Sequence, residues 1–335
     1  MVNTKTCRLV RMALAVLLLS LLLSTCTFFT SDIFPYWLSF VEASVDLREI
    51  SADLGLGSDP IPESLEYAPF DYLGTDYGKV LVFIRGSGGI TRLLLLDPDN
   101  LALKANLFEL GFSPILASAI GGFLCGERNI NPVDYVVDPV PVPIVDLNRL
   151  FKVGVAPAGQ NYVVQQSSST QAVFANYDVD WTPGPSVTRI FDSSSYDYNI
   201  LDADYVQGYS VLGRRSYSDQ GYAASFASAG DFTAGGTVFD LALAVKTGPF
   251  PVADDRAWLT AGGPVAFERA DKDSRLVRYK YGTGNFATGA KAEELDSIIF
   301  NDDDYRILSF DSSGKWWFVY DYYSGSLYKL RTWWK

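Results

Sequence analysis

The chain has 335 residues, of which 48% are hydrophobic and 14% aromatic, so it can build a large core and is too apolar for a disordered protein. Its formal net charge of −12 disfavours nucleic acid as a partner, because a phosphate backbone carries the same sign. The chain contains no histidine, which excludes Ser-His-Asp and Cys-His catalysis, an imidazole pH switch and most zinc sites.

The N-terminal residues have the layout of an export signal. The positive charges that open the chain are Lys5, Arg8 and Arg11. An apolar run of twelve residues, Met12 to Leu23, follows and is too short to cross a bilayer comfortably. Leu9 to Ser24 is therefore expected to be helical and to pack on no other part of the chain, because it serves translocation rather than a core.

The apolar run ends at Leu23-Ser24-Thr25-Cys26, which resembles the lipobox of bacterial lipoproteins. In that family the cysteine becomes the first mature residue and carries lipid. The residue before it is usually Gly, Ala or Ser, and Thr25 in that place resembles the relaxed lipoboxes of spirochaetes. The resemblance implies a covalent lipid on Cys26 that anchors the protein to a bacterial membrane, on the periplasmic face or at the cell surface. A plain signal peptide or an uncleaved anchor is the alternative.

The cysteine count agrees with a lipid on Cys26. Cys7 would leave with the signal, so Cys125 has no partner for an intramolecular disulfide. Cys125 ends the strand-like run that begins at Gly122, and this context favours a buried, inert thiol over a nucleophile.

Three parts of the chain are expected. Residues 1–25 form the lipoprotein signal, residues 26–70 hold the lipidated cysteine, a tether and one closing strand, and residues 71–335 form the main domain. The closing strand is expected around Val45, because the sequence there partly alternates between apolar and polar residues. Gly55 to Pro69 is rich in Gly, Pro and Ser, which is typical of a linker.

From Tyr72 onward the sequence predicts short antiparallel strands joined by tight turns. Lys79 to Ile84 and Ile90 to Leu96 are apolar runs on either side of a glycine-rich turn. The end of the chain has the same texture, a meander of three aromatic and β-branched runs: Ile307–Phe310, Trp316–Tyr320 and Ser326–Leu330.

An apolar strand end followed by Asp and a turn recurs along this part of the chain. The aspartates are Asp97, Asp146, Asp192 and Asp240, and their spacings are 49, 46 and 48 residues. A period in the forties with about four short strands in each repeat is typical of propeller blades. The sequence therefore predicts an all-β protein, a β-propeller of about six (six to seven) blades, preceded by a signal-peptide helix. An array of β-sandwiches is the alternative.

The order of strands and turns over about 260 residues resembles the irregular β-propellers of exported bacterial proteins, such as the TolB-like and YncE-like repeats. No WD dipeptide, kelch glycine pair or PQQ-type motif is repeated. In such a ring the strand near Val45 is expected to pair with the last blade and so remove the exposed edges. Trp333 and Trp334 are then expected to be largely buried by early residues.

Clusters of acidic residues could hold calcium, because hard cations need several oxygen ligands. The candidates are Asp302, Asp303 and Asp304, and the alternating pair Asp271 and Asp273. Neither cluster has the spacing of a calcium-binding loop, and both lie between strand-like runs, where Asp is a common turn residue. Turn formation is therefore the favoured interpretation, and no metal or other cofactor besides the lipid is expected.

The segment from Ser309 to Trp317 resembles the Asp-box of sialidase-like propellers. It has one residue more between Asp311 and Gly314, and Trp316 stands in the place of the family's threonine. In that family the Asp-box is a structural turn remote from the active site. The resemblance therefore implies the fold and no catalytic role.

A glycan-active hydrolase would need two carboxyl groups about 5 to 10 Å apart. The candidates by residue type are Asp178, Asp180, Asp202 and Asp204. Tryptophan rings could stack on sugars, although they more often fill cores between blades. Trp316 and Trp317 must point to opposite faces of a strand, so at most one is a ligand platform. The Arg214-Arg215 pair could grip a carboxylate or phosphate, but a solvated pair is the favoured interpretation.

Two classes of function remain open. The first is a lipoprotein whose propeller scaffolds a protein or small-ligand interaction in the cell envelope, with an envelope protein or a glycan as the partner. The absence of histidine and of a repeated catalytic motif favours it. The alternative is a carboxylate-dependent hydrolase of glycans, because propellers host both binding proteins and enzymes. Such an enzyme would show two carboxyls facing each other across an aromatic-lined pocket.

Overall fold

A computed structural model describes residues 36–107, 116–142, 150–155, 160–168, 171–178, 180–190, 197–202, 209–216, 236–240, 245–252, 256–269, 274–284, 290–300 and 305–334. The chain divides into two compact units, Met1–Ser39 and Phe40–Lys335. The expected signal helix and the lipobox lie outside the described residues. The first described element is the 3-10 helix η1 (Tyr36–Phe40), at the boundary of the two units. The fold described below is that of the second unit.

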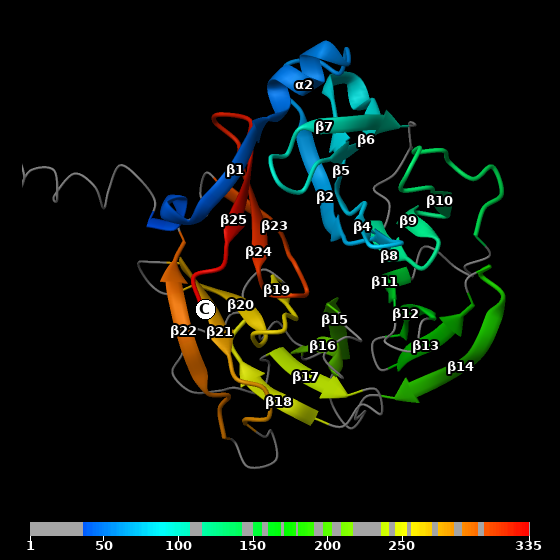
Figure 1. The fold of residues 1–335 in the computed structure, drawn as a ribbon. Coiled ribbons are helices and arrows are strands. Elements are labelled where there is room, and N and C mark those ends of the chain that lie inside the picture. The colour runs from blue at the N-terminus through cyan, green and yellow to red at the C-terminus, as the bar shows by residue number, and fades with distance from the viewer. Residues whose placement is uncertain are drawn as a thin grey trace, which may run out of the picture. The chain divides into compact units, whose positions relative to one another are not determined.

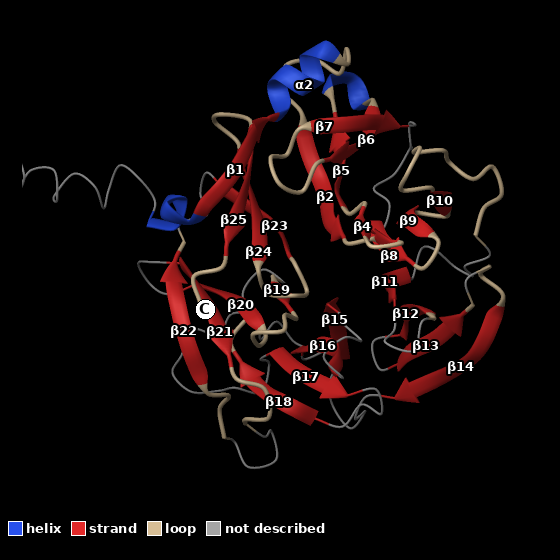
Figure 2. Cartoon of the chain, in the orientation of Figure 1, coloured by secondary structure: helices blue, strands red, loops and turns tan. Residues whose placement is uncertain are grey.

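The Phe40–Lys335 unit is a β-propeller of antiparallel sheets, as Figure 1 shows. Among the described residues, five sheets have the four strands of a blade and a smaller sheet in the ring has three. Figure 2 shows how little helix the described residues contain: besides η1, they form α2 (Leu47–Asp53) and the short turn η2 (Ser87–Gly89). The prediction of an all-β propeller is confirmed. The predicted count of six to seven blades is corrected to five.

The first blade has the strand order β2-β5-β6-β7. Its strands are β2 (Ile61–Ala68), β5 (Lys79–Arg85), β6 (Thr91–Leu96) and β7 (Leu103–Leu107), with a small hairpin of β3 (Asp71–Tyr72) and β4 (Thr75–Asp76) between the first two. The predicted strands around the glycine-rich turn are confirmed. The predicted linker from Gly55 to Pro69 is wrong, because most of it forms β2. Pro62 is tolerated there because β2 is the edge strand of its sheet and its pairing with β5 shifts register between Pro62 and Ser64.

The smaller sheet has the order β10-β9-β8, with β8 (Leu116–Ala119), β9 (Gly122–Cys125) and β10 (Arg128–Ile130). An irregular segment runs along its outer edge, where Val137 bridges Ile130 and the Asp138 amide donates to the Asn129 carbonyl at 2.8 Å. The prolines of this segment, Pro132, Pro139 and Pro141, cannot donate to a β ladder. Among the described residues this sheet therefore has three strands rather than the four of a full blade.

The next three blades run in sequence order from their innermost strand outwards. The second blade has β11 (Leu150–Val155), β12 (Asn161–Ser168), β13 (Gln171–Tyr177) and β14 (Pro183–Ile190). The third blade has β15 (Asp197–Asp202), β16 (Tyr209–Ser216), β17 (Gly236–Asp240) and β18 (Val245–Phe250). The fourth blade has β19 (Ala257–Trp258), β20 (Val265–Arg269), β21 (Ser274–Tyr279) and β22 (Glu294–Ile299).

The closing blade joins both ends of the unit, in the order β1-β25-β24-β23. It combines β23 (Tyr305–Phe310), β24 (Trp316–Asp321) and β25 (Ser326–Arg331) with β1 (Val41–Asp46). Val45 lies opposite Leu327, so the predicted pairing of the early strand with the last blade is confirmed. The innermost strands β2 and β23 lie side by side and complete the ring. Strand β1 ends at Asp46, whose carboxylate accepts from the Arg48 amide at 2.8 Å and so caps α2.

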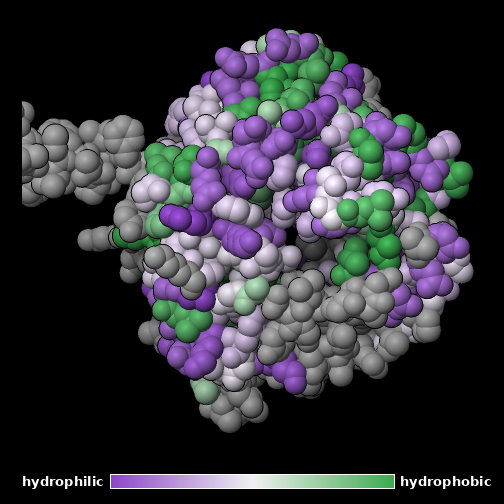
Figure 3. Space-filling model, viewed as in Figure 1, coloured by the Kyte–Doolittle hydropathy of each residue, from purple (hydrophilic) through white to green (hydrophobic). Residues whose placement is uncertain are grey.

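The hydrophobic core consists of clusters between successive sheets. One joins the closing and first blades through Phe318, Tyr320 and Val82, and the Tyr320 hydroxyl donates to the Pro60 carbonyl at 2.7 Å. Other clusters join the first blade to the smaller sheet, that sheet to the second blade, and the third blade to the fourth. Figure 3 shows that apolar side chains on the viewed surface gather in separate groups rather than in one large patch. No described helix has the length and apolar character needed to cross a membrane.

Candidate functional site

The carboxylates considered for a hydrolase have structural partners where they are described. Asp178 and Asp180 lie in the turn after β13, where the Gln160 side-chain amide donates to Asp178 Oδ1 at 3.5 Å and the Thr182 backbone amide donates to Asp180 Oδ1 at 3.1 Å. The bonds from Thr182 lower the pKa of Asp180. Asp202, at the end of β15, accepts from the Leu259 amide at 2.8 Å and so ties the third blade to the fourth. Asp204 lies outside the described residues.

Several other predicted residues also lie outside the described part of the chain. They are Leu23, Ser24, Thr25 and Cys26 of the lipobox, the acidic residues Asp302, Asp303 and Asp304, the pair Asp271 and Asp273, and the side chains of Arg214 and Arg215. Within the described ranges, no three acidic, Cys or His side chains come together as potential metal ligands. The calcium hypothesis for Asp302–Asp304 therefore stays a hypothesis.

The Asp-box-like segment is a turn between β23 and β24. The buried carboxylate of Asp311 accepts from the Ser313 backbone amide at 3.2 Å and from the Ser313 hydroxyl. The backbone carbonyl of Asp311 accepts from the Gly314 amide at 2.9 Å. Burial raises the pKa of Asp311. Cys125 is buried at the end of β9, and burial raises its pKa to about 12, which makes it an inert thiol.

A network of four titratable side chains spans β20, β21 and β22 of the fourth blade. Arg275 donates to Glu268 Oε2 from Nε at 3.1 Å and from Nη2 at 2.9 Å, and to Glu294 Oε1 from Nη1 at 3.2 Å. The Tyr279 hydroxyl donates to Glu268 Oε1, and its ring stacks on Phe250 of the third blade, with centroids 4.7 Å apart. The Glu268 side chain is only 8% exposed.

This Glu268 network brings two carboxyl groups, those of Glu268 and Glu294, to one arginine. Both oxygens of Glu268 are nevertheless engaged, and its partner Tyr279 belongs to the apolar cluster between the third and fourth blades. Burial raises the pKa of Glu268. The network therefore contains residue types that catalytic sites use, but its position between the third and fourth blades is that of a structural link.

Glu268→Gln is expected to remove a pH dependence of stability. The pKa of Glu268 is higher in the folded state than its ordinary value of 4.5 in the unfolded state. The wild-type carboxyl therefore stabilises the folded protein fully at pH values below 4.5, and this stabilisation is lost as the pH rises through the pKa of the folded state. The free energy of unfolding of the wild type relative to the variant should thus fall as the pH rises above 4.5. Urea titrations at several pH values measure it, and a flat difference would contradict the burial argument.

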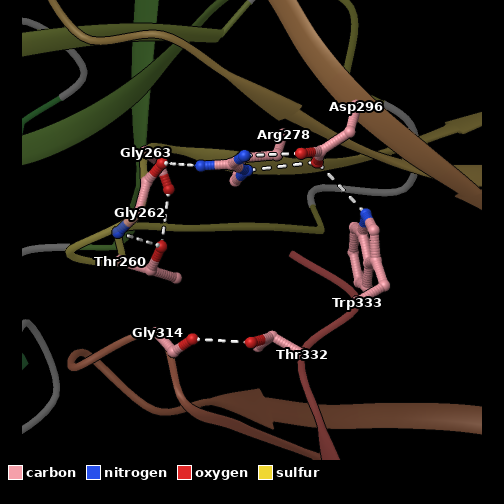
Figure 4. Close-up of polar contacts among 8 residues, drawn as sticks. All are labelled: Thr260, Gly262, Gly263, Arg278, Asp296, Gly314, Thr332 and Trp333. Atoms are coloured by element: carbon pink, nitrogen blue, oxygen red, sulfur yellow. Dashed lines mark hydrogen bonds and ion pairs between the residues drawn. The ribbon is translucent and has the colours of Figure 1, made fainter. Parts of the chain in front are cut away.

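The opposite face of β21 carries a second polar cluster, the C-terminal clasp, which Figure 4 draws without its fifth residue, Trp334. Arg278 donates to Asp296 Oδ1 from Nε at 3.1 Å, to Asp296 Oδ2 from Nη2 at 2.5 Å, and to the Gly262 carbonyl from Nη1 at 2.7 Å. The Trp333 indole donates to Asp296 Oδ1 at 3.2 Å, and the Arg278 guanidinium lies 5.0 Å from the Trp334 ring centroid. We define the clasp as Arg278, Asp296, Gly262, Trp333 and Trp334.

The clasp fastens the end of the chain across two blades. After β25, the Thr332 amide donates to the Lys315 carbonyl at 3.0 Å and its hydroxyl to the Gly314 carbonyl at 2.8 Å, both in the closing blade (Figure 4). The next two residues then reach Arg278 and Asp296 in the fourth blade. Trp333 and Trp334 are half-buried, and their partners come from late residues rather than the early ones predicted.

Arg278→Gln is expected to lower the free energy of unfolding by about 1–3 kcal/mol. The change leaves the carboxylate of Asp296 without its bidentate partner, and unpaired, partly buried charges cost this order of energy. Arg331→Gln, an exposed position, is the matched control and should change stability by less than about 0.5 kcal/mol. Urea denaturation measures both, and equal effects would show that the pair is not a clasp.

The tandem tryptophans of β24 point to opposite faces, as predicted. Trp317 is fully buried and stacks on Phe310, with centroids 5.5 Å apart. Trp316 is half-buried, and the Lys329 ammonium lies 3.9 Å from its ring centroid. The one ring that could serve as a platform thus already carries a cation of the chain itself.

No protein-family model matches this chain, and no curated protein shows a significant sequence match to it. Function must therefore be argued from the residues themselves. Sequence reasoning missed the Glu268 network and the clasp, because each joins residues on different strands. The available signal was the spacing of the polar residues in β21. Because side chains alternate along a strand, Arg275 and Tyr279 must lie on one face and Arg278 on the other.

Proposed function

We propose that the chain is an exported bacterial lipoprotein, anchored to a membrane through a lipid on Cys26, whose propeller is a binding scaffold for a protein or small ligand of the cell envelope. The order of segments carries the proposal. A positive segment and an apolar run end at Cys26, and a compact all-β unit begins at Phe40. That order is typical of an anchored exported domain.

An ordered loop beside the smaller sheet supports a protein partner. Val133, Val136 and Val140 are 49%, 59% and 67% exposed, respectively. The backbone amide of each valine donates to the side-chain oxygen of the residue two positions earlier. The acceptors are Asn131, Asp134 and Asp138, at 2.9, 3.1 and 2.9 Å, respectively. A loop held in this way presents apolar surface without losing much entropy on binding, which favours contact with another protein. Nucleic acid remains a disfavoured partner because of the net charge of −12.

Cys26→Ala is expected to release the protein from membranes without unfolding the propeller, because the lipid supplies the membrane affinity. Cell fractionation together with labelling by a palmitate analogue measures this. The wild type should carry label and sediment with membranes, whereas the variant should carry none and keep the circular dichroism of a folded β-protein. A wild type that takes up no label would overturn the proposal.

The alternative function, a carboxylate-dependent hydrolase of glycans, draws on one observation, the two glutamates held by Arg275. If the Glu268 network were catalytic, Glu268→Gln would abolish the release of sugar from cell-envelope glycans while leaving the fold intact. A wild type that releases no sugar, or a variant that releases as much, would exclude this role for the network.

A further inference from the structure

The outer edge of the fourth blade differs from the outer edges of the other sheets. Proteins usually protect an exposed edge strand with lysine or proline, because its free backbone groups can pair with another chain. The outer strands β7, β14 and β18 each contain such residues: Lys104, Pro183, Pro185, Lys246 and Pro249. In the outer strand β1 the exposed side chains are the polar ones of Glu42 and Ser44.

Strand β22 has neither a lysine nor a proline, and it exposes two large apolar side chains. Leu295 and Ile299 are 41% and 62% exposed. β22 is the last strand of its sheet, and no described strand pairs with its outer side. Figure 1 shows β22 at the rim of the ring, with β21 on its inner side. This edge is therefore open and partly apolar.

The backbone of β22 also has groups that a further strand could bind. The Phe300 amide donates to the Ser274 carbonyl at 2.9 Å, so the backbone of Phe300 is directed towards β21. The direction of backbone groups alternates along a strand, and the amides and carbonyls of Ser297 and Ile299 therefore point away from β21. These donors and acceptors lie on the same edge as the exposed apolar side chains.

The sequence of this edge is complementary to itself. Leu295 and Ile299 are equally far from Ser297, on either side of it. If two copies of β22 pair antiparallel around a two-fold axis at Ser297, Leu295 of each copy lies opposite Ile299 of the other. The three residues share one face of the strand, because side chains alternate. A register shift within the chain lies opposite Leu295, at the end of this stretch rather than at its centre.

The acidic residues of this edge are balanced by basic residues of the same chain. The ion pairs are Glu293–Lys280 at 3.0 Å, Glu294–Arg275 at 3.2 Å and Asp296–Arg278 at 2.5 Å. The edge therefore presents no unpaired charge between residues 293 and 299.

The pairing around Ser297 also keeps acidic residues apart. It places Asp296 of one copy opposite Ile298 of the other, and Glu294 opposite Phe300, so no two acidic residues face each other. The acidic run Asp302–Asp304 follows the paired stretch and lies outside the described residues. The net charge of −12 on each chain still opposes the approach of two copies, and added salt should therefore strengthen the pairing.

We propose that β22 is the self-association edge of this protein. Two copies pair antiparallel at Ser297 and join their fourth blades into one continuous sheet, with Leu295 of each copy covering Ile299 of the other. The inference goes beyond the proposed binding scaffold, and it does not require the lipid on Cys26. Loss of either proposal therefore leaves the other intact.

Ser297→Cys tests the position of the axis. Residues that face each other in a hydrogen-bonded antiparallel pair have Cα atoms about 5.5 Å apart, which a disulfide can bridge. Tyr323→Cys, at a position that is 73% exposed, is the matched control for random collisions. Cells that express each full chain are oxidised with copper phenanthroline. Mass spectrometry then measures the peptide in which two copies of the introduced cysteine are joined, so other cysteines of the chain do not contribute.

Leu295→Cys and Ile299→Cys test the register. Co-expressed, the two variants should form a disulfide between positions 295 and 299. Leu295→Cys alone should form little, because two copies of position 295 would lie about 13 Å apart along the paired strands, beyond the reach of a disulfide. Ile299→Lys combined with Ser297→Cys should remove the disulfide at position 297, because a lysine protects the edge. Both residues are exposed, so the variants should fold.

We expect the disulfide at position 297 to exceed that at position 323 by at least about fivefold, and to increase further when sodium chloride is raised from about 50 to about 500 mM. Equal yields at positions 297 and 323 would overturn the self-association. Equal yields from Leu295→Cys alone and from the mixed pair would overturn the two-fold register. A yield that falls with added salt would indicate an ionic contact and would overturn the apolar pairing.

Discussion

Truncation after Lys329 is expected to unfold the whole Phe40–Lys335 unit in one cooperative step. The deletion removes Leu330, which is fully buried between Val41 and Trp317, and it removes the two tryptophans of the clasp. Losing one buried Leu or Trp side chain typically costs about 2–5 kcal/mol. The loss of Leu330, together with the packing of the two half-buried tryptophans, is comparable with the lower part of the usual net stability of a domain, about 5–15 kcal/mol.

Circular dichroism during urea titration measures this effect, and Arg331→Gln in the full-length chain provides the control for loss of charge at that end. The truncated chain should lack a folded baseline, because an open ring exposes a long β edge as well as apolar surface. A truncated protein that unfolds at the same urea concentration as the full chain would mean that the last residues are a dispensable tail.

Trp317→Ala is expected to cost about 3–5 kcal/mol, the range for removing a large buried aromatic side chain. Trp317 contacts the rings of Phe300, Phe310 and Trp333, and its indole donates to the Arg331 carbonyl at 3.1 Å. The substitution therefore opens a cavity between the fourth and closing blades and removes a support of the clasp. Chemical denaturation followed by fluorescence of the remaining tryptophans measures it.

Trp316→Ala is the matched control, one position away on the other face of β24. The half-buried ring of Trp316 holds the Lys329 ammonium, an interaction worth about 0.5–2 kcal/mol. We expect the control to cost less than half as much as Trp317→Ala. Equal costs at the two positions would contradict the assignment of Trp317 to the core between blades.

The meander at the end of the chain was predictable because each strand carries its own local signal. Apolar runs at Ile307–Phe310, Trp316–Tyr320 and Ser326–Leu330 became β23, β24 and β25 with shifts of one or two residues. The closing strand was predictable for a different reason. A ring must bury its edges, and the alternation around Val45 supplied a strand that could do so.

The predicted repeat of Asp residues was only partly correct, because the blades differ in the length of sequence that they occupy. The innermost strands begin at residues 61, 116, 150, 197, 257 and 305, so successive sheets are between 34 and 60 residues apart. Asp97 follows the third strand of its blade and Asp240 ends the third strand of another, as the repeat requires. Asp146 and Asp192 fall between sheets in the sequence. A fixed period therefore overestimated the number of full blades.

The polar clusters of the fourth blade could not be predicted, because they depend on register across strands. Glu268 meets Arg275 only because β20 and β21 pair at that step, and the residue opposite Arg278 is Asp296. A slip by one residue would send each side chain to the other face. The predicted carboxylates, by contrast, were chosen by type, and the described ones, among them Asp178 and Asp180, lie in turns and links.

The mass of the N-terminal peptide from protein purified out of bacterial membranes tests the proposed lipoprotein most directly. We predict that this peptide begins at Cys26 and carries the mass of a diacylglyceryl group on its thiol, with no residue of the segment from Met1 to Thr25 remaining. A peptide that begins elsewhere, or an unmodified Cys26 thiol, would contradict the anchor and leave the propeller without a means of attachment.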